Sequence, residues 1–396
     1  MESQRGGFWP GLLSLTCDIG WDAVPFISLF FTPTITNLNL TLPHESNRLL
    51  QPTLSLLAHT CRQLQSLTMN VGIPDALSGG EMGRLISASR HTLRRIDIRS
   101  FTPSDVFPAI FNLSQLQDLS LQEPSLPNQV SPKTLPHLQA INFNGNHGLN
   151  LTQFLRGLSV TRLARVTISR GGTIQLSTLL EPLCGATAVM RVLYLSPVVA
   201  LDPSSNTLLR SFANLTSLIL NCVCKDPQPN VSCNFQPTDE SVQELGGALP
   251  RIHLLSLSRG CCGPRHVTFA SLICLSMTCS DLENLSIRVD FTSIVSGSDQ
   301  LNHRNPSLGT DSARPQRALS KLNVLDVGNS PLPQIPRCEW MVALALVRIF
   351  PSVRLCSSYC PEETRKRWEE VQEDVLGCQR IFGITQAAGK RVSGYI

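Results

Sequence analysis

The chain has few charged residues and few aromatic ones. Of its 396 residues, 16% are charged and 6% are aromatic, and the formal net charge is +4. A charge this small and dispersed does not indicate binding to a polyanion or to a membrane surface. The low aromatic content also argues against stacking platforms for single-stranded nucleic acid. We therefore expect no nucleic acid and no membrane among the binding partners.

Long apolar runs are also missing, since no stretch reaches the roughly 18 uninterrupted apolar residues that a membrane-spanning helix needs. The opening FWPGLLSLTCDIGW, from Phe8, is apolar, but Pro10, Gly11 and the pair Cys17-Asp18 interrupt it. A secretory signal needs a continuous apolar block and a small-residue cleavage site. We therefore expect no signal peptide, a cytoplasmic or nuclear location, and reduced thiols at the 14 cysteines.

Recognisable catalytic motifs are absent as well. The sequence has no G-x-S-x-G and no H-E-x-x-H, and the glycine-rich SGGEMGR from Ser78 lacks the Lys-Ser/Thr ending of a phosphate-binding loop. The eight histidines are scattered. We expect no catalytic residues, no cofactor and no enzyme activity.

The cysteines give only weak indications of a metal site. Structural zinc sites use paired C-x-x-C knuckles. The cysteines that come closest together form C-x-C and C-C pairs instead, and Cys356 and Cys360, which could share one helix face, supply only two ligands. We interpret them all as core or loop thiols, and a zinc site remains the minor alternative for the cluster Cys222, Cys224, Cys233, Cys261 and Cys262.

What the sequence does contain is an internal repeat. The pattern L-x-x-L-x-L, with other apolar residues allowed at the Leu positions, recurs at a mean spacing of about 28 residues, close to the 20–29 residues of leucine-rich repeats. Its twelve starts are Leu12, Ile35, Leu64, Leu93, Leu116, Leu138, Leu163, Met190, Leu215, Ile252, Leu282 and Leu322.

The segments between these strands predict helices. PTLSLLAHTC, GGEMGRLISASRHT and FASLICLSMTC each lead into a repeat, and TDESVQELGGALP offers Thr238 or Asp239 as an N-cap. A strand and a helix of this size cannot bury their apolar faces alone, so neighbouring units must stack. The sequence therefore predicts an α/β leucine-rich-repeat solenoid, a horseshoe of about 12 strand–helix units with a parallel concave sheet and a C-terminal capping helix. The alternative is a compact α/β enzyme or zinc protein with a doubly wound parallel sheet.

Composition suggests how the chain is divided. We expect a solenoid over residues 1–355, with surface insertions at about 223–238 and 293–319 that are rich in Pro, Ser, Asn and Gly. Residues 356–396 are expected to form the helical cap and tail. Arg365, Lys366 and Arg367 alternate with acidic residues, which indicates a solvated face of that cap.

The concave sheet is the expected binding surface. Strand residues alternate, so the third and fifth residues of each L-x-x-L-x-L, and the residue after it, point away from the core. Solenoids bind partners on this extended face, and a mixture of Arg, Asp, Asn and Tyr suits a protein partner. The candidate binding residues are Arg95, Asp97, Arg99, Asp118, Gln122, Asn142, Asn144, Arg165 and Tyr194.

Three details resemble a known family. Cys61 and Cys279 each stand three residues before the first Leu of a repeat, and EWMVALALVRIFPSV from Glu339 precedes RKRWEEV from Arg365. These features resemble the cysteine-containing repeats and the closing helices of fungal F-box/leucine-rich-repeat proteins. The resemblance implies a substrate receptor of a ubiquitin ligase, in which an N-terminal F-box docks the Skp adaptor of a cullin complex.

The F-box itself has no counterpart before Leu12, where LLSLTC predicts a first strand and WDAVPFISLFF its helix. We therefore expect the chain to begin inside the solenoid. Either Phe8 and Trp9 fold back as a cap, or an F-box preceded them. A stand-alone repeat scaffold without a ubiquitin role is the alternative to the substrate-receptor hypothesis.

Overall fold

The structure is a computed structural model that describes residues 9, 11–18, 20–42, 47–71, 79–99, 104–122, 133–145, 150–159, 161–169, 175–196, 203–221, 235, 237–257, 267–292, 294, 321–335, 338–358 and 360–382. The chain divides into two compact units. The first comprises residues 1–174 and 178–197, and the second comprises residues 175–177 and 198–396.

The first unit alternates strands with short helices. Its strands are β1 (Ser14–Asp18), β2 (Asn37–Leu42), β3 (Ser66–Val71), β4 (Arg95–Ile98), β5 (Asp118–Gln122), β6 (Lys133–Thr134), β7 (Ala140–Asn144), β8 (Leu158–Ser159), β9 (Arg165–Ser169) and β10 (Val192–Leu195). Its helices are the 3-10 helices η1 (Trp21–Phe30), η2 (Ser104–Val106) and η3 (Glu181–Ala186), and the α-helices α1 (Asn47–Thr60), α2 (Gly79–Ala88), α3 (Phe107–Ile110), α4 (Asn150–Gly157) and α5 (Leu176–Leu180).

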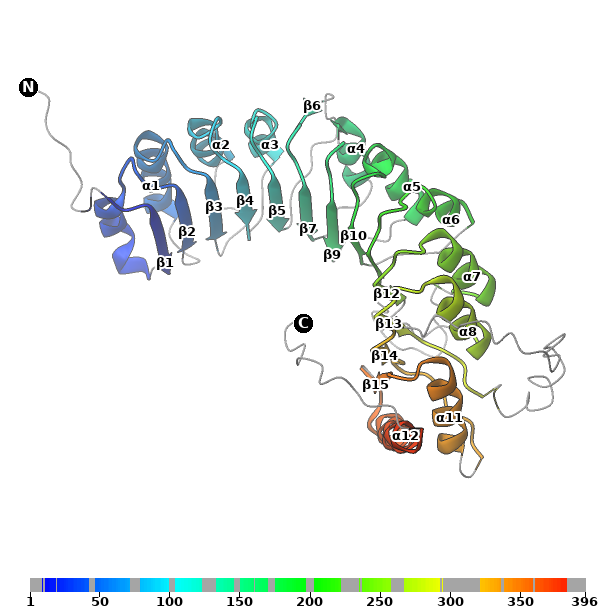
Figure 1. The fold of residues 1–396 in the computed structure, drawn as a ribbon. Helices are drawn as coiled ribbons and strands as arrows, with labels where there is room; N and C mark the ends of the chain where they lie inside the picture. Colours follow the sequence, from blue (N-terminus) through cyan, green and yellow to red (C-terminus); the bar gives the residue numbers. More distant parts are fainter. Residues whose placement is uncertain are drawn as a thin grey trace, which may run out of the picture. The chain divides into compact units, whose positions relative to one another are not determined.

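The main sheet of the first unit is parallel and its strands follow chain order. The order is β1-β2-β3-β4-β5-β7-β9-β10, and β6 pairs with β8 separately. The helices lie on one side of this sheet (Figure 1). A doubly wound sheet would reverse its strand order and carry helices on both faces, so the doubly wound fold of the alternative is wrong.

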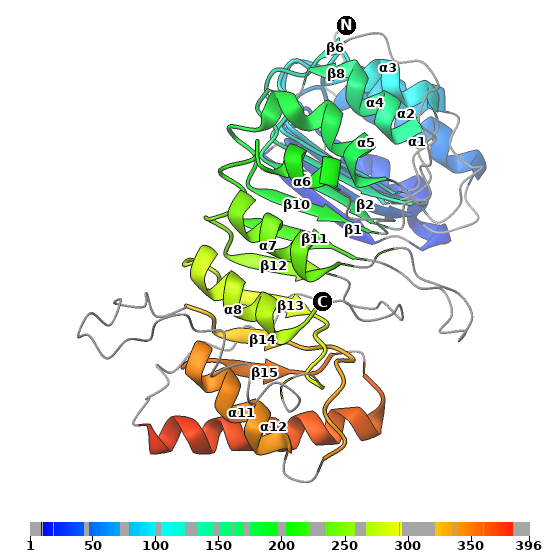
Figure 2. The same ribbon diagram turned by 90° about the vertical axis from the view of Figure 1, so that its right-hand side faces the viewer.

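The second unit continues the same alternation. Its elements are α6 (Pro203–Leu209), β11 (Ser217–Leu220), α7 (Asp239–Ala248), β12 (Leu254–Leu257), α8 (Phe269–Thr278), β13 (Asn284–Ile287), β14 (Val324–Asp326), α11 (Cys338–Ile349), β15 (Arg354–Cys356) and α12 (Glu362–Ile381). The strands are again parallel and in chain order, and Figure 2 shows the helices beside them.

A recurring pair of backbone hydrogen bonds joins each repeat to the next repeat along the chain. The carbonyl of Gln65 accepts from the N–H groups of Arg94 (2.8 Å) and Arg95 (3.0 Å), and the carbonyl of Arg94 accepts from those of Gln117 (2.7 Å) and Asp118 (3.0 Å). This arrangement satisfies the polar groups where each chain segment enters its strand, as a buried backbone requires. The same pair occurs at the carbonyls of Thr36, Gln117, Gln139, Ala164, Thr216, His253 and Glu283.

The apolar positions of the repeat form the core between sheet and helices. In the repeat at Leu64, the side chains of Leu64, Leu67 and Met69 are fully buried. Phe107 and Phe143 both pack edge-on against Phe154, with ring centroids 5.5 and 5.4 Å apart. Burying each such side chain stabilises the fold by about 1.5–3 kcal/mol. The core of every repeat therefore depends on the neighbouring repeats.

All twelve predicted strands are observed, which confirms the leucine-rich-repeat fold. The structure adds the short strands β6 and β8, which pair with each other, and β15, whose segment after Val353 lacks the full L-x-x-L-x-L pattern. None of the three was predicted. The helix predicted after the first strand is a 3-10 helix.

Two buried thiols connect successive repeats. The Cys61 Sγ lies 3.5 Å from the carbonyl oxygen of Thr32, and the Cys279 Sγ lies 3.6 Å from that of Gly246 and 3.8 Å from that of Leu249. Both side chains are fully buried. Each thiol therefore acts as a small core residue that also donates a weak hydrogen bond to the preceding repeat.

A side-chain cluster joins the starts of α7 and α8. The sequence offered two N-caps for α7, and the structure selects Thr238, whose Oγ1 accepts from the Ser241 N–H at 3.2 Å. The Asp239 carboxylate is instead turned to the next repeat. It accepts from the N–H of Thr268 (2.7 Å), from its hydroxyl (2.8 Å) and from the Ser271 hydroxyl (2.5 Å).

Helix α12 closes the last repeat, as predicted. Trp368 is buried against Phe291 (ring centroids 5.1 Å apart) and its Nε1 donates to the carbonyl of Ser330 at 2.9 Å. The side-chain oxygen of Gln372 accepts from the backbone N–H of Leu355 in β15. Figure 2 shows α12 crossing the end of the sheet beside β15. The edge of the last strand is therefore occupied by a helix.

The interpretation of residues 365–367 as one solvated face is only partly right. Arg365 and Lys366 pair with Glu362 on the surface of α12. Arg367 instead reaches α11, where it pairs with Glu339 at 2.7 Å and donates to the carbonyl of Pro333 at 2.7 Å. The Arg367 guanidinium holds the cap against the last repeat. Partial burial of Glu339 acts to raise the pKa of its carboxyl, but the hydrogen bonds from Arg367 help to lower that pKa below its ordinary value.

Several sequence predictions fall outside the described residues. These are Phe8, the cysteines 222, 224, 233, 261 and 262, and most of both insertions. Cys356 and Cys360 are described, and they do not share a helix face. Cys356 ends β15, and Cys360 follows it in irregular backbone before α12.

Replacement of Gly246 should destabilise the fold. A Cβ atom on this residue of α7 would lie 2.6 Å from the Thr278 hydroxyl and 3.1 Å from a Leu275 methyl, both on α8. We expect Gly246→Ala to lower the free energy of unfolding by about 1–3 kcal/mol through overpacking, measured by urea denaturation.

Gly247 provides the matched control, because nothing lies within 4 Å of a Cβ at this position in the same helix. Gly247→Ala should raise the free energy of unfolding by up to about 1 kcal/mol through helix propensity. Equal effects of the two substitutions would contradict the close approach of α7 and α8.

Cys61 should be unreactive in the folded protein. Burial raises the pKa of its thiol to about 11, whereas an exposed cysteine titrates near about 8.5. At pH 8 we expect iodoacetamide to modify Cys61 about 100-fold more slowly than an exposed thiol, because only the thiolate reacts. The exposed Cys184 is the internal reference. Peptide mass spectrometry measures both rates, and equal rates would disprove the buried contact.

Candidate functional site

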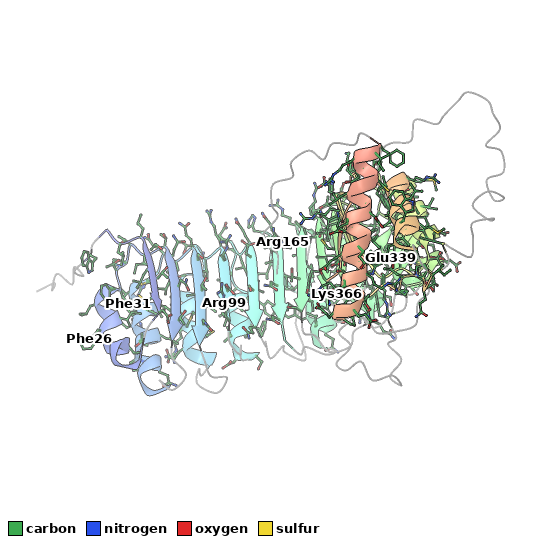
Figure 3. All side chains as sticks on the ribbon, turned by 90° about the horizontal axis from the view of Figure 1, so that it is seen from below. Phe26, Phe31, Arg99, Arg165, Glu339 and Lys366 are labelled. Carbon is green, nitrogen blue, oxygen red and sulfur yellow. The ribbon has the colours of Figure 1, made fainter. Side chains whose placement is uncertain are left out.

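The candidate site is the face of the first unit's sheet that lies opposite the helices, named here the open face. Burial alternates along its strands, so every second side chain points to the core and the others line this face. Strand register then arranges these side chains in rows across the strands. Figure 3 shows Arg99 and Arg165 among the strands of this unit.

Three rows cross the middle of the open face. The predicted residues Arg95, Asp97, Asp118, Gln122, Asn142, Asn144, Arg165 and Tyr194 lie on them, and the predicted Arg99 is exposed directly after β4. The first row is Arg95, Asp118, Ala140, Arg165 and Val192, the second is Asp97, Ser120, Asn142, Thr167 and Tyr194, and the third contains Gln122, Asn144 and Ser169.

Four of the charged residues form ion pairs within the face. Both Nε and Nη2 of Arg95 donate to Asp118 Oδ2 at 3.2 Å on the neighbouring strand. Arg99 Nε donates to Asp97 Oδ2 at 2.9 Å on its own strand. Both arginine side chains remain more than 60% exposed. Exposed pairs contribute at most about 1 kcal/mol to stability, so these pairs orient the guanidinium groups more than they stabilise the fold.

Arg165 differs from the other two arginines. It is exposed in β9, and no ion pair joins it to a carboxylate in the part of the chain that the structure describes. Its row neighbours are Ala140 and Val192, which carry no charge. Tyr194 is half-buried one row away, in β10. A protonated arginine flanked by small apolar side chains can accept an acidic group without displacing a partner of its own.

The amides of the face are partly satisfied. Asn142 Nδ2 donates to Ser120 Oγ at 3.3 Å, which continues the second row by a side-chain hydrogen bond. Asn144 Oδ1 is buried and has no hydrogen-bond partner among the described residues. An unpaired buried oxygen carries a free-energy penalty of about 1–3 kcal/mol, which a donor from a bound molecule would relieve.

The structure extends the face beyond the predicted middle repeats. Register places Asn37, Ser66 and Thr68 in line with Arg95 and Asp97, on β2 and β3. The same alternation in the sequence would have identified these uncharged polar residues. The expectation that the residue after each L-x-x-L-x-L points outward is wrong at Ser196, after β10, whose side chain is buried.

The corresponding rows of the second unit mix polar and apolar side chains. The first row is Ser217, Leu254, Asn284, Val324 and Arg354, and the second contains Ile219, Ser256, Ser286 and Asp326. Asp326 is buried, and its Oδ1 accepts from the N–H groups of Gly328 and Ser358 at 3.1 Å each. Asp326 therefore has a structural role, whereas the aspartates of the first unit's rows form ion pairs with exposed arginines.

The described residues contain no group of three or more His, Cys, Asp and Glu side chains placed to hold a metal ion. In the same residues, no helix combines the length and apolar character needed to span a bilayer. The chemistry of the open face is that of hydrogen bonds and charge pairs.

The fold thus defines the class of the protein as a leucine-rich-repeat protein. No family model matches the sequence, and no curated protein matches it. Among solved structures, the chain is similar to the yeast Rad7 and Elc1 complex, at 18% identity and a TM-score of 0.43 over 80% of this chain and 75% of that chain.

Two bacterial structures show similar values. The leucine-rich-repeat-containing protein LegL7 from Legionella pneumophila has 18% identity and a TM-score of 0.36, over 62% of this chain and 82% of that chain. The internalin InlF from Listeria monocytogenes has 18% identity and a TM-score of 0.37, over 65% of this chain and 76% of that chain. The fold assignment depends on the strands and helices of the chain itself.

Proposed function

We propose that the protein binds another protein through the open face of its first unit and that it has no catalytic activity of its own. The observation that carries this proposal is the set of three polar rows, in which both signs of charge, amides and a tyrosine lie on one rigid sheet. The ordered sheet holds these groups in place before binding, which lowers the entropic cost of association.

The chemistry of the rows favours a protein over other ligands. A polyanion would select an excess of Lys and Arg, whereas Arg95 and Arg99 are each matched here by an aspartate. Arginine and tyrosine are the residues that most often dominate protein–protein affinity. Arg165 and Tyr194 lie in adjacent rows on β9 and β10, and we assign them to the centre of the interface.

The finer proposal is that the bound protein is a substrate of a ubiquitin ligase. Its support is the resemblance of the sequence to fungal F-box/leucine-rich-repeat proteins. Two parts of that resemblance have defined structural roles in this chain. Cys61 and Cys279 connect successive repeats, and the Trp368 helix closes the last one. A repeat scaffold without a ubiquitin role remains the alternative.

Charge reversal at Arg165 tests the binding face. Proximity labelling in the native cell would first supply a partner, and its affinity is then measured by calorimetry with the purified full chain. Arg165→Glu should weaken binding by about 2 kcal/mol or more, as for an interfacial hot spot, with the thermal midpoint unchanged.

Arg62 provides the control, since it is exposed after α1, outside the rows, and its Nε donates only to the carbonyl of His59. Arg62→Glu should leave the affinity unchanged. An affinity that is lost with Arg62→Glu and kept with Arg165→Glu would place the binding surface on the helical side of the repeats.

Capture of a Skp–cullin complex tests the finer proposal separately. The full-length natural protein, immobilised and exposed to purified Skp adaptor, should retain the adaptor if it is a ligase receptor. Retention should survive Arg165→Glu, because substrate and adaptor occupy different surfaces. Clean absence of retention, together with partner binding at the open face, would establish the repeat scaffold instead.

A further inference from the structure

The edge of the first unit's sheet at β1 presents backbone groups for pairing. Among the described residues, β1 pairs only with β2, from Ser14 opposite Asn37 to Asp18 opposite Thr41. A strand at the edge of a sheet leaves alternate N–H and C=O groups unpaired and is a template for another strand. Figure 1 shows β1 as the first strand of the sheet.

Apolar side chains lie beside this edge. Phe26 and Leu29 of η1 are 62% and 50% exposed, and Phe30 is also exposed. A 3-10 helix has three residues per turn, so Phe26 and Leu29 lie on one side of it. Val24 and Ile27, on η1 as well, are buried. Figure 3 shows Phe26 at this end of the unit, with the buried Phe31 toward the neighbouring repeat.

Two further apolar residues extend the patch. Leu13, directly before β1, and Trp9, whose carbonyl accepts from the Leu12 N–H at 3.1 Å, are both more than half exposed. Of the two alternatives for this end, the cap formed by Phe8 and Trp9 gains no support from the exposed Trp9, and Phe8 lies outside the described residues. Phe26, Leu29, Phe30, Leu13 and Trp9 are named here the β1 patch.

The other end of the repeats does not offer the same template. At the outer edge of β15, the backbone N–H of Leu355 donates to the Gln372 side-chain oxygen, and α12 packs along this edge. Another copy of the chain cannot add its β1 there without displacing this helix. A contact that uses only the β1 edge of each copy is isologous, so it closes as a two-fold dimer and does not extend into a filament.

We propose that the β1 patch and the edge of β1 bind a second copy of this chain, with the two β1 strands pairing antiparallel about Thr16. This register places Thr16 opposite its equivalent and Asp18 opposite Ser14. Threonine pairs and serine–aspartate pairs are favourable across strands, whereas like charges directly opposite are not. A register centred on Asp18 would oppose two carboxylates, so like-charge repulsion disfavours that pairing.

The area of the patch suits a dimer of modest affinity. Large apolar side chains bury about 150–250 Å² each, so the exposed parts of five such residues offer roughly 500 Å² per copy. The strand backbone adds to this area, and the total for two copies reaches the lower range of about 1,200 Å² for specific interfaces. The second copy is the occupant that supplies both a free strand edge and a matching apolar patch.

Sedimentation of the purified full chain tests the proposal. We expect a dimer at about 100 μM protein, within reach of a micromolar dissociation constant. Phe26→Asp combined with Leu29→Asp should raise the dissociation constant at least about tenfold, because two charges per copy would enter the apolar contact. Thr16→Asp should weaken the dimer several-fold through like-charge opposition at the two-fold axis.

Two controls isolate the interface. Met277→Asp introduces the same charge at an apolar residue of α8 that is 73% exposed, and Thr68→Asp does so in the row of Thr16 but two strands inside the sheet. Both should leave the dissociation constant unchanged. A wild-type chain that stays monomeric at this concentration would overturn the proposal. So would a dimer that Phe26→Asp with Leu29→Asp does not weaken, or hydrogen exchange showing residues before Trp9 paired with β1.

Discussion

The pair of hydrogen bonds that one carbonyl accepts from the next repeat is the constraint on which the structure depends. The carbonyls of Gln65, Arg94 and Gln117 each accept hydrogen bonds from two successive N–H groups of the following repeat. The bonds fix each strand beside its predecessor and in register, so the side chains of the L-x-x-L-x-L pattern fall into line. Buried leucines then form a continuous core, and the alternate positions form continuous rows on the opposite face.

The rows turn local sequence into an extended surface. Arg95 and Asp118 are 23 residues apart in the chain, yet the register makes them neighbours at 3.2 Å. The same register in the second unit brings Ser217, Leu254, Asn284, Val324 and Arg354 into one row, which mixes polar and apolar side chains. The same backbone arrangement thus carries different side chains in the two units, and the ion-paired rows of the first unit are the ones that we assign to binding.

Much of this could be predicted from the sequence because the repeat is periodic. Every predicted strand is observed, and the alternation of L-x-x-L-x-L alone predicts that Arg95, Asp97 and Arg165 lie on one face. What could not be predicted depends on contacts between segments far apart in the chain. The pairing of Arg367 with Glu339 needs the packing of α12 on α11, and β15 is a strand only because β14 lies beside it.

The ends of the repeats show the same limit. The pattern identified LLSLTC as a first strand, but it could not show that Trp9 would remain exposed, since that depends on what lies beside β1. At the other end, Gln372 occupies the edge of β15 through a single side-chain bond that no sequence motif announces. The two ends differ for a physical reason. Helix α12 covers the edge of β15, whereas exposed aromatic side chains lie beside the edge of β1.

The most direct test of the central claim, binding of a protein through the open face, is side-chain footprinting of the full chain with and without its captured partner. The account predicts that carboxyl-directed labelling of Asp97 and Asp118, and oxidation of Tyr194, decrease in the complex, while oxidation of Met277 on α8 is unchanged. Protection of the helical side of the repeats, with Asp97, Asp118 and Tyr194 labelled as in the free chain, would contradict it.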